Sequence, residues 1–183
     1  MGCTVTELAT NDLTLERLKG FDAVVTGVRL FDTHRNLGPK LDALFAYVEG
    51  GGTVVMQYNL VDGLQSTPLT LKISQERVTD ERAPMTFLVP NSPVLNAPNK
   101  ITTADFNDWV QERGTYFPNQ WDDHFVPILA CNDPGESPLK GALLVANYGQ
   151  GHFIYTGLGF FRQLPAGVPG AYRLFANLIS LGK

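Results

Sequence analysis

The sequence predicts an α/β fold, a three-layer sandwich with a mostly parallel sheet and a C-terminal β-hairpin. Three observations lead to this fold class. Short apolar runs alternate with amphipathic stretches over the first third of the chain, two apolar runs flank a "GQG" turn, and an amphipathic stretch closes the chain. The length of 183 residues suits one domain with one hydrophobic core.

The first elements predicted are a strand, a helix and a second strand. Residues 3–8, "CTVTEL", are rich in β-branched side chains and predict a short strand. Residues 10–20 combine polar capping residues with spaced leucines and predict a short helix. Residues 21–27, "FDAVVTG", predict a fully buried strand.

A longer helix and another buried strand follow. Pro39 suits the first turn of a helix and Gly50 or Gly51 suits its end. The apolar face of this helix is expected to consist of Leu41, Leu44, Phe45 and Val48, which are spaced i, i+3, i+4, i+7. Residues 53–57, "TVVMQ", predict the next strand.

The middle of the chain is predicted to consist mainly of loops. Turns rich in proline, asparagine and aspartate separate three short strands, at residues 68–74, 85–89 and 126–131. Residues 102–110, "TTADFNDWV", begin with a capping threonine and predict a short helix.

The last third has clearer patterns. Residues 140–148 and 152–157 alternate between apolar and polar positions around the turn, which predicts a hairpin. Residues 169–182 predict the closing helix, with Pro169 near its start and Gly182 at its end.

Composition and charge exclude several classes of function. The net charge of −4 leaves no Lys/Arg cluster to hold nucleic acid or an anionic membrane surface. Cys3 and Cys131 are too few for a disulfide framework or a cysteine zinc site. No apolar run approaches the roughly 20 residues that cross a bilayer. We therefore expect no nucleic-acid or membrane partner, and no metal or cofactor.

The residues after each predicted strand are the first candidates for a site, because ligands bind beyond the carboxyl ends of strands in open α/β sheets. They are Arg29, Asp32, His34, Gln57, Tyr58, Asn59, Phe160, Phe161, Arg162 and Gln163. This set is polar and aromatic, and it contains no Ser or Cys nucleophile. The pattern favours binding, and we expect no catalytic residue.

Two further stretches leave alternatives open. In residues 109–121, aromatic side chains surround Glu112 and Arg113, which is typical of a buried ion pair or of an aromatic-lined polar pocket. The ion pair is the more common arrangement. Asp122 and His124 can share one face of an extended segment as metal ligands, but a capped loop is the simpler interpretation.

Four segments together resemble a known family: residues 21–33, "FDAVVTGVRLFDT", residues 47–59, "YVEGGGTVVMQYN", and residues 77–122 and 155–183. They are similar to the C-terminal class I glutamine amidotransferase-like (ThuA-like) domain of bacterial PIG-L/LmbE-type deacetylases. The resemblance covers nearly the whole chain. It implies a flavodoxin-like fold, an adjoining sugar deacetylase, and export of the full-length protein to the periplasm or the exterior.

Two departures from that family bear on activity. The amidotransferase pattern would place a cysteine after residues 53–57, where this sequence has Gln57, Tyr58 and Asn59. The deacetylase half would carry an "HPDDE"-like zinc motif, and this sequence has no such stretch. We therefore expect neither glutaminase nor metal-dependent deacetylase activity.

A third departure concerns the first βα unit. Members of this fold usually open with a strand and helix before the equivalent of residues 3–8, and that unit is missing here. A sheet without it would expose two hydrophobic edges. We expect residues 1–183 to be a single domain that is a fragment of a longer protein, or a shortened domain whose gap is filled, for example by a second copy in a homodimer.

The sequence thus predicts a non-catalytic, amidotransferase-like accessory module that binds a carbohydrate or a protein partner and is associated with a sugar deacetylase. The expected ligand-binding residues are Arg29, Tyr58, Asn59, Glu112, Arg113 and Arg162. One alternative is a hydrolase that acts on a carbohydrate or amide through Glu112 or Asp122. The other is a structural docking domain with an exposed patch of Trp109, Phe160 and Phe161.

Overall fold

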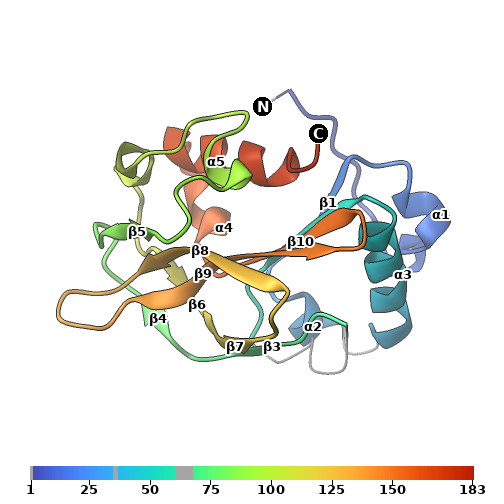
Figure 1. Ribbon diagram of the computed structural model, residues 1–183, viewed down its shortest axis with the longest axis horizontal. Coiled ribbons are helices and arrows are strands. Elements are labelled where there is room, and N and C mark those ends of the chain that lie inside the picture. Colours follow the sequence, from blue (N-terminus) through green and yellow to red (C-terminus); the bar gives the residue numbers. More distant parts are fainter. Residues whose placement is uncertain (1, 35–36, 61–67) are drawn as a thin grey trace.

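The computed structural model describes residues 2–34, 37–60 and 68–183, which form a six-stranded sheet with helices on both faces (Figure 1). In spatial order its strands are β1 (Ala23–Val25), β2 (Thr53–Gln57), β10 (Gly151–Thr156), β9 (Leu139–Tyr148), β8 (Phe125–Cys131) and β5 (Met85–Phe87). Two small ladders pair β3 (Leu71–Ile73) with β7 (Pro118–Trp121), and β4 (Arg77–Val78) with β6 (Gly114–Thr115).

The helices divide between the two faces of the sheet. One face carries α1 (Leu15–Leu18) and α3 (Gly38–Glu49), and the other carries α4 (Phe160–Gln163) and α5 (Pro169–Ile179). The shorter turns are α2 (Leu30–Thr33) and the 3-10 helices η1 (Thr10–Asp12), η2 (Pro93–Leu95) and η3 (Thr103–Phe106). In the part of the chain that the structure describes, no helix combines the length and apolar character needed to span a membrane.

The α/β class and the flavodoxin-like arrangement of layers are confirmed, with a mixed sheet. β2 pairs in parallel with both β1 and β10, whereas the β10–β9, β9–β8 and β8–β5 pairs are antiparallel. The hairpin accounts for the β10–β9 pair, because only residues 149–150 separate β9 from β10 and so short a connection forces antiparallel pairing. The parallel part of the sheet is therefore confined to β1, β2 and β10.

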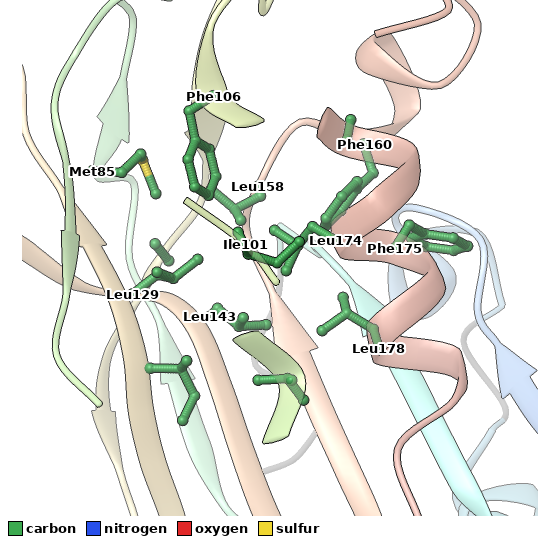
Figure 2. Packing of buried hydrophobic residues seen from close by; sticks show 14 of the residues in the cluster. Met85, Ile101, Phe106, Leu129, Leu143, Leu158, Phe160, Leu174, Phe175 and Leu178 are labelled. Atoms are coloured by element: carbon green, nitrogen blue, oxygen red, sulfur yellow. The ribbon is translucent and has the colours of Figure 1, made fainter. Parts of the chain in front are cut away.

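Two hydrophobic clusters, one on each face, hold the layers together. Successive residues of β2 alternate between them: Val54 packs into the cluster beneath α3, and Val55 packs into the cluster beneath α5. Figure 2 shows the second cluster, in which Leu174 and Leu178 of α5 lie over Leu143 of β9. Because both faces of the central strands are covered, those strands are almost wholly apolar.

The start of α5 lies very close to η3. A Cβ atom on Gly170 would stand 1.8 Å from the backbone oxygen of Asp105, so only glycine fits there. The carboxylate of Asp105 also accepts a hydrogen bond from Arg173 Nε at 2.7 Å. These contacts fix where the loop after η3, residues 107–113, begins.

Most predicted elements are confirmed, and three differ. Residues 3–8 form no strand and pair with no described strand, because residues 5–10 are separated from β1 by a cavity. Residues 21–27 form an edge strand, so Val25 is 41% exposed and the expectation of full burial is wrong. Residues 102–110 make only the short 3-10 turn η3, because the chain turns extended at Asn107.

The packing beneath α5 predicts the cost of removing one leucine. Leu174 is fully buried, so we expect Leu174→Ala to lower the free energy of unfolding by about 2–5 kcal/mol through lost burial and the cavity left behind. Urea unfolding followed by circular dichroism measures this change. Val5→Ala is the control: Val5 is 87% exposed, and its replacement should change stability by about 0.5 kcal/mol or less. Equal effects of the two substitutions would contradict the packing described here.

Candidate functional site

Three parallel strands end side by side, and the residues that follow them form the candidate site. Arg29 follows β1, Tyr58 follows β2, and Arg162 lies in α4 just after β10. Because β1 and β10 both pair in parallel with β2, these residues come to the same edge of the sheet. The backbone N–H of Arg29 donates to the carbonyl oxygen of Tyr58 at 2.7 Å, which joins the first two strand ends.

Tyr58 is the centre of a group of aromatic rings. Its ring stacks on that of Tyr116, with centroids 5.9 Å apart and planes 12° apart. The ring of Phe161 lies 5.2 Å from Tyr58 at a tilt of 52°, and Arg162 stands 4.8 Å over the Phe161 ring. All three rings are partly exposed, so they form an aromatic surface that reaches solvent.

The Tyr58 hydroxyl lies among charged groups. Burial raises the pKa of this hydroxyl above its usual value near 10, and the positive charges of Arg29 and Arg162 oppose the rise. Glu112 adds to the rise. Tyr58 therefore carries its proton at neutral pH and can donate a hydrogen bond to a ligand.

Glu112 is the buried acid of the site and is 5% exposed. Its Oε1 accepts a hydrogen bond from Arg162 Nε at 2.7 Å, and Arg77 Nη2 lies 3.7 Å from its Oε2. The side chains of Arg162 and Arg77 remain 37% and 59% exposed. We call Arg29, Arg77, Glu112, Arg162, Tyr58, Tyr116 and Phe161 together the Tyr58 cluster.

Gln163 connects this cluster to the loop that follows η3. It is fully buried, and its Oε1 accepts from the backbone N–H of Val110 at 2.8 Å. Its Nε2 donates to the carbonyl oxygens of Val110 at 2.9 Å and Glu112 at 3.3 Å. One side chain from α4 thus holds the backbone that presents Glu112.

Strained backbone conformations are concentrated in and beside the Tyr58 cluster. Among the described residues, four that are not glycine have positive φ, and three of them, Arg29 (61°), Gln111 (68°) and Tyr116 (53°), belong to the Tyr58 cluster or adjoin Glu112. Each such conformation costs about 1–2 kcal/mol for an L-residue. Strain of this kind concentrates at functional sites, where the surrounding structure holds it in place.

The structure places four of the six predicted site residues in the cluster and turns two away from it. Asn59 is fully buried, where its Oδ1 accepts from the Phe31 N–H at 3.0 Å and its Nδ2 donates to the Gln57 carbonyl oxygen. Asn59 therefore joins the end of β2 to α2 and is not available to a ligand.

Arg113 is also buried, and the expected ion pair between Glu112 and Arg113 does not form. Arg113 Nε donates to the carbonyl oxygen of Ala83 at 2.9 Å, and its guanidinium lies 5.6 Å over the ring of Trp109. Burial lowers the pKa of Arg113. Glu112 pairs with Arg162 instead, while the Arg113 guanidinium donates to the backbone carbonyl oxygens of Ala83 and Phe106.

Sequence reasoning missed Arg77 and undervalued Tyr116. Tyr116 stands in the aromatic stretch that the sequence singled out, so composition gave a signal for it. Arg77 lies in β4 and comes near Glu112 because β4 pairs with β6, a long-range contact without a local pattern.

The other residues that the sequence singled out have roles in loop hydrogen bonding or in the core. Asp122 Oδ2 accepts from the Thr70 N–H at 2.7 Å and Oδ1 accepts from the His124 N–H at 2.9 Å. In the described chain, no third His, Cys, Asp or Glu joins this pair to make a metal site. Trp109 and Phe160 are 3% and 0% exposed, so they belong to the core and form no docking patch with Phe161.

Neither cysteine of the chain lies in the Tyr58 cluster. Cys131 is buried in β8, and burial raises the pKa of its thiol to about 12. A thiol with that pKa is protonated at neutral pH and is a poor nucleophile. Cys3 is exposed near the N-terminus, far along the chain from the strand ends of the site.

Comparison with known proteins places the fold. No protein-family model and no curated protein match the sequence. Three solved structures match with TM-scores of 0.56. They are the cytoplasmic protein STM3548 from Salmonella typhimurium (17% identity, covering 91% of this chain and 73% of that chain), the cytoplasmic protein STM1381 from Salmonella typhimurium LT2 (13%, 95% and 79%) and a ThuA-like protein from Bacteroides uniformis (12%, 94% and 73%). At these identities the likeness concerns the fold alone, and the chain has a ThuA-like fold.

The bonds of Gln163 predict a structural effect of its removal. Gln163→Ala leaves two backbone groups of Val110 without their side-chain partner, so we expect a loss of roughly 1–3 kcal/mol in the free energy of unfolding. Urea unfolding measures it. Gln120→Ala, at an exposed position of β7, is the matched control and should have almost no effect. A stable Gln163→Ala variant would show that the loop does not depend on this side chain.

The raised pKa of Tyr58 predicts a pH dependence of stability. Because the folded state favours the neutral phenol, the stabilisation is complete below the usual pKa near 10 and is lost as pH rises through the higher pKa of the folded protein. The free energy of unfolding should therefore fall less steeply above about pH 10 in Tyr58→Phe than in the unsubstituted protein. Urea unfolding at a series of pH values checks this, and identical slopes would contradict the burial of the hydroxyl.

Proposed function

We propose that this chain is a non-catalytic binding module of ThuA-like fold and that its ligand is a carbohydrate held at the Tyr58 cluster. The observation that carries the proposal is the composition of this cluster. Three partly exposed aromatic rings stand beside three partly exposed guanidinium groups, at the carboxyl ends of parallel strands. None of the residues in the cluster is a serine or cysteine, so binding is the chemistry that these groups support best.

The rings give the ligand an apolar surface. Tyr58 and Tyr116 stack on one another, and Phe161 extends the same group toward Arg162. Binding sites for small molecules commonly combine such aromatic walls with a few placed polar groups. The C–H face of a sugar ring suits this wall, while the Tyr58 hydroxyl can donate a hydrogen bond at its edge.

The guanidinium groups give the ligand hydrogen-bond donors and positive charge. Arg162 uses its Nε for Glu112, and Arg29 Nε lies 3.5 Å from Asp32 Oδ2, so nitrogens of both groups remain for other acceptors. Asp32 and Glu112 offset two of the three positive charges of Arg29, Arg77 and Arg162, which leaves one in excess. Hydroxyl and carboxylate oxygens of a sugar suit these donors.

The proposed association with a deacetylase rests on the resemblance of the sequence to domains attached to PIG-L/LmbE-type enzymes. On this view the adjoining enzyme acts on the same class of sugar, so acetylated sugars and free amino sugars are the first ligands to test. An adjoining deacetylase would act on its substrate while this module holds the carbohydrate.

The hydrolase alternative has weaker support. Both carboxylate oxygens of Glu112 are engaged by guanidinium groups, Oε1 at 2.7 Å from Arg162 Nε and Oε2 at 3.7 Å from Arg77 Nη2. Both carboxylate oxygens of Asp122 accept backbone hydrogen bonds. The activity of Glu112→Gln on acetylated oligosaccharides distinguishes the two functions, since only a hydrolase would have an activity to lose.

The proposal predicts which substitutions weaken binding. In a thermal-shift screen of acetylated sugars, amino sugars and oligosaccharides, we expect at least one to raise the melting temperature. A ligand at 100 times its Kd adds about 2.7 kcal/mol of stability. Tyr58→Ala and Arg162→Ala should each weaken binding of that ligand about tenfold or more in isothermal titration calorimetry, since each removes a direct contact.

Arg17→Ala is the matched control for charge. Arg17 lies in α1, is exposed, and stands 5.2 Å over the ring of Phe21, which does not belong to the Tyr58 cluster. It should bind the ligand as the unsubstituted protein does. Binding that survives Tyr58→Ala and Arg162→Ala alike would move the site elsewhere, and a screen without any shift would overturn the carbohydrate proposal.

A further inference from the structure

The charged groups at the Tyr58 cluster lie in two layers, with the acids buried and the bases exposed. The side chains of Asp32 and Glu112 are 8% and 7% exposed, whereas those of Arg29 and Arg162 are 48% and 37% exposed. A ligand that arrives from solvent therefore meets guanidinium groups first, and the carboxylates lie behind them.

The buried carboxylates already have partners. Glu112 Oε1 accepts a hydrogen bond from Arg162 Nε at 2.7 Å. Asp32 Oδ2 accepts from the backbone N–H of Leu60 at 3.0 Å and lies 3.5 Å from Arg29 Nε. A guanidinium group has N–H donors and no acceptor, and these contacts use only the Nε atoms of the two arginines. The exposed layer thus offers donors, while the acceptors beneath it are engaged.

Arg29 and Arg162 both lie close to Tyr58. The Arg29 N–H donates to the Tyr58 carbonyl oxygen at 2.7 Å, and Arg162 stands 4.8 Å over the ring of Phe161, which is 5.2 Å from the Tyr58 ring. Burial raises the pKa of the Tyr58 hydroxyl, and the charges of both arginines act on this pKa in the opposite direction. The two guanidinium groups therefore border the same aromatic surface.

We infer that the ligand is a hexuronic acid, a sugar ring with one carboxylate, and that this carboxylate is held between Arg29 and Arg162. Its ring then lies against the aromatic surface of Tyr58 and Phe161. The inference rests on the proposed carbohydrate function and narrows it to one class of sugar. A guanidinium group binds a carboxylate through two parallel N–H···O bonds, which adds geometric specificity as well as strength.

The charge of the cluster separates this class from two related ones. Asp32 and Glu112 leave one positive charge of the three arginines in excess, so a single carboxylate on the ligand balances the cluster. The ammonium group of an amino sugar would instead meet exposed positive charge. A phosphorylated sugar carries close to two negative charges, and the second would face the two carboxylates of the site.

Isothermal titration calorimetry with matched ligands tests this inference. The probes are the methyl glycosides of glucuronic acid and galacturonic acid, and each is compared with its own methyl ester. The ester keeps the ring and loses the charge, so we expect at least one acid to bind about tenfold or more tightly than its ester. A rise in NaCl from about 20 mM to about 300 mM should weaken binding of the acid and leave binding of the ester unchanged.

Two substitutions identify the arginines that hold the carboxylate. Arg29→Gln and Arg162→Gln should each reduce the preference for acid over ester about threefold or more, because each removes a charge and keeps a long polar side chain. Arg29→Gln guards against misfolding, since Asp32 retains its bond from the Leu60 N–H. Arg17→Gln, outside the Tyr58 cluster, is the control and should keep the full preference.

The outcomes separate this inference from the function on which it rests. Equal binding of acid and ester would overturn the acidic sugar and leave the carbohydrate function standing, as would tighter binding of glucosamine or glucose 6-phosphate than of either acid. A full preference for the acid in both glutamine variants would also overturn it, because the carboxylate would then lie elsewhere. If no sugar of any class raises the melting temperature, the proposed function itself fails.

Discussion

The parallel pairing of β2 with β10 is the constraint on which the rest of the molecule depends. It brings together segments about a hundred residues apart, with Thr53 opposite His152 and Gln57 opposite Thr156. This register sets the end of β2 beside the start of α4, so Tyr58 meets Phe161. The β9–β10 hairpin then extends the sheet on the side of β10 that faces away from β2. The carboxyl ends of β1, β2 and β10 therefore stay together and uncovered at one edge of the sheet. Without this pairing, neither the two-sided core nor the aromatic group would form.

Local sequence patterns were sufficient to predict those helices and strands whose periodicity lies wholly within one segment. The central strand β2, the helices α3 and α5 and the β9–β10 hairpin were predicted because each carries its own alternation and its own turn or cap. The rule of strand ends also led to Arg29, Tyr58 and Arg162. The inward turn of Asn59 and Arg113 could not be predicted, because it depends on partners such as Phe31 and Ala83 that lie far away in the sequence.

The site combines strained backbone with strong local support. Gln111, between η3 and β6, and Tyr116, between β6 and β7, hold left-handed conformations. The fully buried Gln163 fixes the backbone between η3 and β6 through Val110. The close approach of Gly170 to Asp105 anchors the beginning of the same loop. Such support is what allows a loop to present charged and aromatic groups in one geometry before a ligand arrives.

The buried thiol of Cys131 has a consequence for how the opening of the fold can be followed. Burial raises the pKa of this thiol to about 12, so the thiol is protonated at neutral pH, and β5 and β9 flank its strand on both sides. An alkylating reagent can reach it only when that part of the sheet separates, whereas the exposed Cys3 is open to the reagent in the folded state. The labelling rate of Cys131 relative to that of Cys3 therefore reports how often this part of the sheet opens.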